Sequence, residues 1–321
     1  MQLRDKPELL KSYLDLSLRA AVAAGFEILD VYAKDFEVDF KADDTPLTEA
    51  DRRAHTVISR MLAAPGSPAG ADAAPAGAGA GQGAAGSGAA PAALPILSEE
   101  AAHQPFAERA EWGAFWLVDP LDGTKEFVKR NGEFTVNIAL VENGEPIMGV
   151  VYAPHLGELY WGGVGLGAFK LRNNSPSRFH VMADSATLTK HGTALPDPAA
   201  GRTRSNGQRP FTVVASRSHM SPETEAFVQE QRAAHPELQL VSAGSALKLC
   251  LVAEGSADLY PRFAPTMEWD TGAGHAVAAA AGCSVDEYPA GTPLRYNKEN
   301  LVNPWFLVAA PHIASEHNSE G

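Results

Sequence analysis

Apolar residues recur at helical spacing in the first part of the chain. Seven of them predict an amphipathic helix that faces a core: Leu10, Tyr13, Leu14, Ala21, Ala24, Ile28 and Val31. Phe36 to Phe40 alternates apolar and charged residues, which is typical of a strand, and Thr48 to Leu62 returns to helical spacing. The pattern therefore predicts a helix, a strand and a second helix.

The central part of the chain has short apolar runs typical of strands. These runs are Leu94 to Leu97, Ala114 to Val118, Thr135 to Glu142 and Ile147 to Ala153. Asn143-Gly144 marks a tight turn between the last two runs, so they are predicted to form an antiparallel hairpin. Leu156 to Phe169, which is rich in glycine and aromatic residues, indicates further sheet.

The last third of the chain alternates predicted strands and helices. Strands are expected at Phe211 to Ala215, Leu238 to Val241, Ala257 to Tyr260 and Trp305 to Val308, and helices at Ser221 to Ala234, Ala246 to Glu254 and Thr271 to Ala281. This alternation is typical of an α/β protein. The pattern predicts an antiparallel sheet and paired helices in the first half of the chain and an α/β arrangement in the second.

Composition separates one segment from the rest of the chain. Of the 29 glycines in 321 residues, 8 lie in Ala63 to Ala93, together with 15 alanines and 4 prolines. That segment offers almost no side chain to bury, so a disordered insertion at 63–93 is expected. A second polar stretch, Asp184 to Pro210, has no periodicity and divides the chain into halves at 1–183 and 211–321.

Charge and cysteine content narrow the class of protein. The chain has 26 Lys and Arg against 39 Asp and Glu, a net charge of −13, which argues against a nucleic-acid partner. Cys250 and Cys283 are predicted to be reduced core thiols. Residues 1–32 carry charges throughout and lack the apolar run of a signal peptide or a membrane span. We expect a cytoplasmic protein, with any peripheral association with a membrane and the oligomeric state left open.

Acidic residues stand at the ends of predicted elements in three separate places. They are Glu99 after the run that ends at Leu97, Asp119 and Asp122 on either side of Pro120 and Leu121, and Asp270 directly before a helix. Clustered carboxylates repel one another unless cations neutralise them, and such oxygen ligands suit Mg²⁺, which bridges carboxylates to substrate phosphate. Two such ions can activate a water and stabilise the leaving oxygen. The pattern predicts metal-dependent hydrolysis of a phosphoester.

Each acid also has an interpretation without metal. Asp270 fits a helix N-cap, Asp119 and Asp122 fit a turn after a strand, and Glu99 and Asp51 fit solvated acids. Turns and caps do not explain why apolar strands end in acids at three separate places. The combination favours the metal site.

Three ordered motifs resemble those of the inositol monophosphatase-like, lithium-sensitive phosphatases. They are Asp119-Pro-Leu-Asp-Gly-Thr-Lys-Glu-Phe127, the preceding Ser98-Glu99-Glu100 and the later Trp269-Asp270-Thr-Gly-Ala-Gly274. Within that superfamily, four runs look like bacterial 3'(2'),5'-bisphosphate nucleotidases: Lys125 to Leu140, Ser216 to Met220, Leu247 to Asp270 and Leu294 to Val308.

The resemblance covers nearly the whole chain except 63–93 and the stretch around 184–210. It implies a layered αβαβα sandwich and Mg²⁺-dependent hydrolysis of adenosine 3',5'-bisphosphate to AMP and phosphate, within sulfate assimilation.

The resemblance also implies roles for individual residues. Glu99, Asp119, Asp122, Asp270 and the backbone carbonyl of Leu121 would bind two or more Mg²⁺ ions and border the substrate, while Thr124 and Asp51 would position or deprotonate the attacking water. The amides of Gly123 and Thr124 would hold the phosphate, and Gly123 lets the backbone come close to it.

Further residues are candidates for contact with the nucleotide. Ser216, Arg217, Ser218 and His219 follow a predicted strand, where α/β sheets bind ligands, although composition alone indicates a loop with a structural histidine. Lys248 and Arg295 are weaker candidates for a second phosphate, with a surface charge or a snorkelling side chain as the alternative.

Three other functions compete with this prediction. A phosphatase with an aspartyl nucleophile uses a D-x-D-G-T motif, whereas the acids Asp119 and Asp122 are spaced one residue further apart. An inositol monophosphatase or sugar-bisphosphate phosphatase of the same superfamily is the second candidate. A nucleotide-sensing scaffold on an inactive phosphatase fold is disfavoured because every expected metal ligand is intact.

Overall fold

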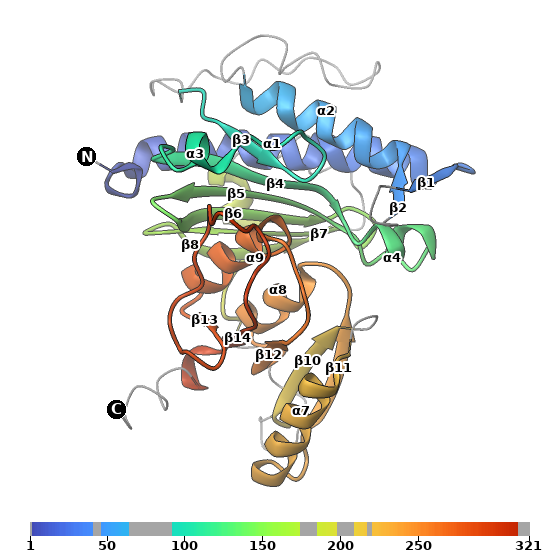
Figure 1. Cartoon of the computed structure of the whole chain (residues 1–321), viewed down its shortest axis with the longest axis vertical. Helices are drawn as coiled ribbons and strands as arrows, with labels where there is room; N and C mark the ends of the chain where they lie inside the picture. Colours follow the sequence, from blue (N-terminus) through green and yellow to red (C-terminus); the bar gives the residue numbers. More distant parts are fainter. Residues whose placement is uncertain are drawn as a thin grey trace.

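The computed structural model describes residues 2–40, 46–63, 92–173, 185–197, 209–216 and 220–313. Helices and two sheets alternate in five layers, as Figure 1 shows. From top to bottom these are a helical pair, a seven-stranded sheet, a second helical pair, a five-stranded sheet and one outer helix. This arrangement confirms the predicted αβαβα sandwich.

The larger sheet forms the second layer. Its strands, in spatial order, are β3 (Ile96–Ser98), β4 (Ala114–Asp122), β5 (Thr135–Glu142), β6 (Glu145–Ala153), β7 (Glu158–Gly163), β8 (Gly167–Arg172) and β9 (Thr193–Ala194). Neighbours are antiparallel except β3 and β4, which are parallel. Asn143 and Gly144 both have positive φ, as the tight turn of the predicted β5–β6 hairpin requires.

Two long helices cover one face of this sheet. They are α1 (Pro7–Tyr32), which has proline in its first turn, and α2 (Glu49–Ala63). The apolar side of α1 is buried against α2 and the sheet, in a core that includes Trp116 and Tyr152. The predicted amphipathic helices are therefore confirmed. None of the described helices has the length and apolar character needed to cross a membrane.

The opposite face of the sheet packs against α8 (Leu247–Ala253) and α9 (Glu268–Ala280). Small residues bring α9 close to the strands. A Cβ on Gly149 of β6 would lie 2.2 Å from the carbonyl oxygen of Ala273, so only glycine permits this approach. The close contact fixes where α9 begins relative to the ends of β3 and β4.

The smaller sheet has the order β11 (Gln239–Ala243), β10 (Thr212–Ser216), β12 (Leu259–Arg262), β14 (Phe306–Ala309) and β13 (Ser284–Glu287). Its outer face packs against α7 (Pro222–Ala234), whose N-cap Ser221 accepts a hydrogen bond from the Thr224 amide. The remaining elements are η1 (Leu3–Asp5), β1 (Val38–Phe40), β2 (Pro46–Thr48), α3 (Phe106–Arg109), α4 (Thr124–Val128) and α6 (Ser185–His191).

The structure differs from the sequence-based predictions in several places. Strand β4 does not stop at Pro120; its pairing with β5 resumes at Asp122 after a register shift, so the proline sits in a bulge. Strand β13 was not predicted. The polar stretch after Asp184 contains α6 and β9, because their few apolar residues pack on β8 and α1. Of the predicted insertion at 63–93, residues 64–91 lie outside the described residues.

His275 in α9 gives the fold a pH-sensitive contact. The buried Nδ1 lies 3.0 Å from the hydroxyl of Tyr296, and burial lowers the pKa of His275 to about 3. Because this folded-state pKa is below the unfolded value of about 6.5, the unfolded chain takes up more protons between these values. The contribution of the neutral His275 ring to the free energy of unfolding is therefore fully present above pH 6.5 and is lost as the pH falls towards 3.

We expect His275→Gln to lose less stability on acidification than the wild type. The difference in the free energy of unfolding between pH 7 and pH 4.5 should be smaller in the variant by about 2 kcal/mol. Urea unfolding at the two pH values measures it. An equal acid loss in both proteins would show that His275 does not contribute.

Candidate active site

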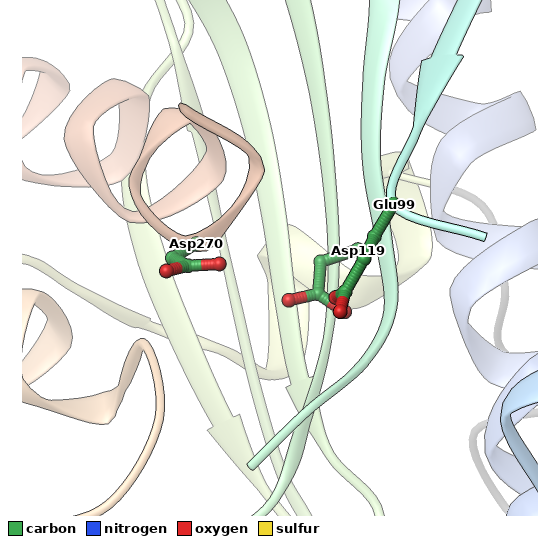
Figure 2. Close-up of side chains that lie close together, drawn as sticks. All are labelled: Glu99, Asp119 and Asp270. Atoms are coloured by element: carbon green, nitrogen blue, oxygen red, sulfur yellow. The ribbon is translucent and has the colours of Figure 1, made fainter. Parts of the chain in front are cut away.

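Three carboxylates from different elements converge between the larger sheet and α9. Glu99 directly follows β3, Asp119 lies on β4 and Asp270 lies in the first turn of α9. One oxygen from each lies within 4.8 Å of the others. Figure 2 shows Glu99 and Asp119 together, with Asp270 approaching from the helix on the other side.

Local backbone contacts hold these acids in place. The parallel pairing of β3 with β4 continues past the strand end, because the Glu99 amide donates to the Val118 carbonyl at 3.2 Å. Asp270 is the third residue of α9 rather than its N-cap, and its Oδ2 accepts a hydrogen bond from the Met267 amide at 2.9 Å. The N-cap interpretation of Asp270 is thus wrong, although the carboxylate does close the helix start.

The carboxylates oppose one another electrostatically. Burial and then the charges of Glu99, Asp122 and Asp270 raise the pKa of Asp119 well above its usual value. Burial, followed by the charge of Asp122, raises the pKa of Asp270 to about 8. Each carboxylate makes ionisation of its neighbours less favourable. A divalent cation bound to these hard oxygen donors would neutralise their negative charges. The residues present therefore fit a metal ion.

The turn after β4 presents a fourth acid and backbone groups to the same place. The Asp122 Oδ2 accepts a hydrogen bond from Asn137 Nδ2 on β5 at 3.2 Å. Gly123 follows with φ +89°, a left-handed conformation that glycine adopts without strain. Helix α4 starts at Thr124, so its first amides face the turn. The sequence patterns did not indicate Asn137, because its role depends on a cross-strand contact.

Thr124 connects the turn to α2. Its hydroxyl lies 3.3 Å from Asp51 Oδ1 and 3.3 Å from the carbonyl oxygen of Leu121. The other carboxylate oxygen of Asp51 accepts hydrogen bonds from the amide and hydroxyl of Thr48, both at 2.7 Å. Burial raises the pKa of Asp51 to about 6. This pair is an oriented hydroxyl and carboxylate that can hold and pass a proton.

A pocket of about 240 Å³ contains most of these groups. Among the residues selected from the sequence, its lining includes Glu99, Asp119, Leu121, Asp122, Gly123, Thr124, Ser216, Lys248 and Asp270. Arg217, Ser218 and His219 lie outside the described residues. Arg295 is elsewhere, where it pairs with Glu145 and donates to the Asn143 carbonyl.

Two buried cationic side chains line the same pocket. Lys248 is buried, with burial lowering its pKa to about 8. Arg262, at the end of β12, is also buried; one of its Nη atoms donates to the Pro265 carbonyl, and its Nε has no hydrogen-bond partner among the described residues. Sequence reasoning missed Arg262, although a charged residue at the end of an apolar strand was the signal used for the acids. The pocket therefore offers anion-binding groups beside the acidic cluster.

Comparison with known proteins identifies the family. The description "Inositol monophosphatase family" matches residues 91–319. A protein of Escherichia coli strain K12 named 3'(2'),5'-bisphosphate nucleotidase CysQ is 41% identical over 299 residues, which are 92% of this chain and 99% of that protein. A protein of the same name from Shigella flexneri is 42% identical over the same shares.

Solved structures agree with this assignment. The crystal structure of CysQ from Bacteroides thetaiotaomicron, described as a bacterial member of the inositol monophosphatase family, is 41% identical with a TM-score of 0.71. The similarity covers 95% of this chain and 98% of that one. An inositol monophosphatase of Thermotoga maritima, 20% identical with a TM-score of 0.62 over 95% of this chain and 94% of its own, shares the fold. The chain belongs to the inositol monophosphatase family.

Proposed function

We propose that this chain is a Mg²⁺-dependent 3'(2'),5'-bisphosphate nucleotidase that removes the 3'-phosphate of adenosine 3',5'-bisphosphate, giving AMP and phosphate. Two relatives from Escherichia coli that carry this name match 92% of the chain at 41% identity. The observation that carries the proposal is one pocket with two kinds of phosphate-binding group. The acidic cluster and the α4 turn suit one phosphate, and Lys248 with Arg262 suits another.

Glu99, Asp119, Asp122 and Asp270, with the Leu121 carbonyl, would hold two or more Mg²⁺ ions. Their oxygens are the ligand type that Mg²⁺ prefers, and three of the four carboxylates already lie within 4.8 Å. Bound Mg²⁺ would supply Lewis acidity to the phosphate and lower the pKa of the attacking water. The Gly123 and Thr124 amides, at the start of α4, would orient the phosphate oxygens.

The Thr124 hydroxyl and Asp51 would accept the proton that the attacking water releases. The hydroxyl can accept a hydrogen bond from that water while it donates to Asp51 Oδ1, 3.3 Å away. Asp51 is fixed by Thr48 through its other oxygen, Oδ2, which leaves Oδ1 as the oxygen that faces the Thr124 hydroxyl. Direct attack by water needs no covalent intermediate on an aspartate.

Lys248 and Arg262 would bind the second phosphate. Both are buried in the pocket wall, where burial lowers the pKa of Lys248, the charge of Asp122 raises it and the charge of Arg262 lowers it again. A phosphate bound there would offset the repulsion between the two cations. The partnerless Nε of Arg262 would gain an acceptor. A substrate with one phosphate would not form hydrogen bonds with these two cations, at a cost of about 1–3 kcal/mol, or about 5-fold to 150-fold in affinity.

A phosphate-release assay tests the proposal. The purified chain is offered adenosine 3',5'-bisphosphate, adenosine 3'-monophosphate and inositol 1-phosphate, with Mg²⁺, with EDTA and with Mg²⁺ plus Li⁺. We expect the bisphosphate to be hydrolysed with at least about tenfold higher kcat/KM than the monophosphate. EDTA should abolish turnover, and Li⁺ should inhibit it. Faster turnover of inositol 1-phosphate would overturn the proposed substrate.

The cellular setting follows from the same proposal. Removal of a nucleotide bisphosphate belongs with sulfate assimilation, which places the protein in the cytoplasm, and the two buried thiols Cys250 and Cys283 suit a reducing compartment. We retain the division into halves at 1–183 and 211–321 as a proposal, with the substrate between β4 of the first half and α8 of the second.

A further inference from the structure

A small hydrogen-bonded junction joins the two loops that bring phosphate-binding groups to the pocket. One loop is the turn from Asp122 to Thr124, and the other is the connection from Ala243 to Ser245 before α8. Ser245 Oγ lies 2.8 Å from the carbonyl oxygens of both Asp122 and Glu133. The carboxylate of Glu133 accepts a hydrogen bond from the Gly244 amide at 2.9 Å.

The two loops are packed so closely at this junction that a side chain on either glycine would clash. A Cβ on Gly244 would lie 2.7 Å from the Glu133 carbonyl oxygen, and one on Gly123 would lie 2.2 Å from Ser245 Oγ. Ser245 itself has φ +50°, a left-handed conformation that is strained for a residue other than glycine. Its contacts with Asp122 and Glu133 hold it there, so the two loops have one fixed separation.

The position of Lys248 depends on this loop. Its Nζ donates to the Ser245 carbonyl at 2.5 Å and lies 3.4 Å from the Ala243 carbonyl. Glu133 fixes the loop through the Gly244 amide, yet it is absent from the lining of the pocket in the described part of the chain. Its hydrogen bond to the Gly244 amide therefore acts on the loop whose Ser245 carbonyl accepts from Lys248.

We propose that Glu133 is a positioning residue that sets the separation of the two phosphate subsites and so the preference for bisphosphates over monophosphates. The inference rests on the proposed function. Two linked groups bind together only when the spacing of their sites matches the spacing in the ligand. A looser loop would leave each subsite able to bind, but no longer at the separation that one nucleotide spans.

The test compares kcat/KM for adenosine 3',5'-bisphosphate with kcat/KM for adenosine 3'-monophosphate in four proteins. In Glu133→Ala we expect the ratio to fall about tenfold through a higher KM for the bisphosphate, with the monophosphate value within twofold of wild type. Glu133→Gln keeps an acceptor oxygen for the Gly244 amide and should restore the ratio to within threefold. Glu225→Ala, an exposed acid of α7, is the control.

A fifth protein, the variant Gly244→Ala, changes the same junction without altering Glu133. Gly244→Ala places a methyl against the Glu133 carbonyl, so it should displace the loop and lower the ratio as well. An equal fall for both substrates in Glu133→Ala would show a purely structural role and overturn the inference, as would an unchanged ratio. A wild type without preference for the bisphosphate would instead overturn the proposed function, a result that no Glu133 variant can produce.

Discussion

Asp119→Asn is expected to lower kcat/KM for adenosine 3',5'-bisphosphate by more than about 100-fold. Loss of an outer partner of a metal ligand costs about 10-fold to 100-fold, so loss of a ligand charge at the centre of the cluster should cost more. Asparagine keeps the oxygen that accepts from the Leu121 amide at 3.1 Å, so the backbone of the turn should remain in place. Steady-state phosphate release measures the effect.

The same substitution should raise the stability of the metal-free protein. The folded-state pKa of Asp119 is raised, so its stabilising contribution is complete only below the unfolded value near 3.8 and is lost as the pH rises. At pH 7 the aspartate therefore destabilises the fold, and Asp119→Asn should melt at a higher temperature in EDTA.

Mg²⁺ should reverse this order, because it binds the folded wild type and raises its Tm by mass action. Asp35→Asn, an exposed acid, should behave as the wild type in both conditions. If Asp119→Asn kept the full Mg²⁺-induced rise in Tm, the assignment of Asp119 as a metal ligand would be wrong.

Asp51→Asn and Thr124→Val are each expected to lower kcat by about 10²-fold to 10⁴-fold, the usual contribution of a positioned proton acceptor. KM should change little, because neither side chain is needed to hold the nucleotide. Thr124→Ser keeps the hydroxyl that lies 3.3 Å from Asp51 and should retain most activity.

The double variant Asp51→Asn/Thr124→Val gives the sharper result. If the hydroxyl and carboxylate act as one unit, the double variant should be no slower than the slower single variant. Multiplied losses would indicate two independent roles and contradict the proton path through Thr124.

Elements with strong periodicity were predictable from sequence. Strand β5 has the predicted bounds Thr135–Glu142, since every residue in it is buried and Val136, Ile138 and Leu140 recur at every second position. The Asn143-Gly144 turn fixed its pairing with β6. The acids at three element ends were also predicted to form one site. They do converge, because β3 and β4 are parallel and α9 packs on the same sheet.

Features that depend on distant contacts were not predictable. Helix α9 begins at Glu268, before the predicted start, because Asp270 closes its first turn and the Glu268 carboxylate accepts from the amides of Asn297 and Lys298. Asn137 and Glu133 acquire their roles through contacts with other elements, at Asp122 and Gly244, so their residue types alone gave no signal.

The most direct test of the metal site is the anomalous scattering of Mn²⁺ in crystals of the wild-type protein. The account predicts a peak at ligand distance, about 2.0–2.4 Å, from carboxylate oxygens of Glu99, Asp119 and Asp270, the three that converge in Figure 2. Peaks only at other residues, in a protein that hydrolyses adenosine 3',5'-bisphosphate with Mn²⁺ in solution, would contradict it.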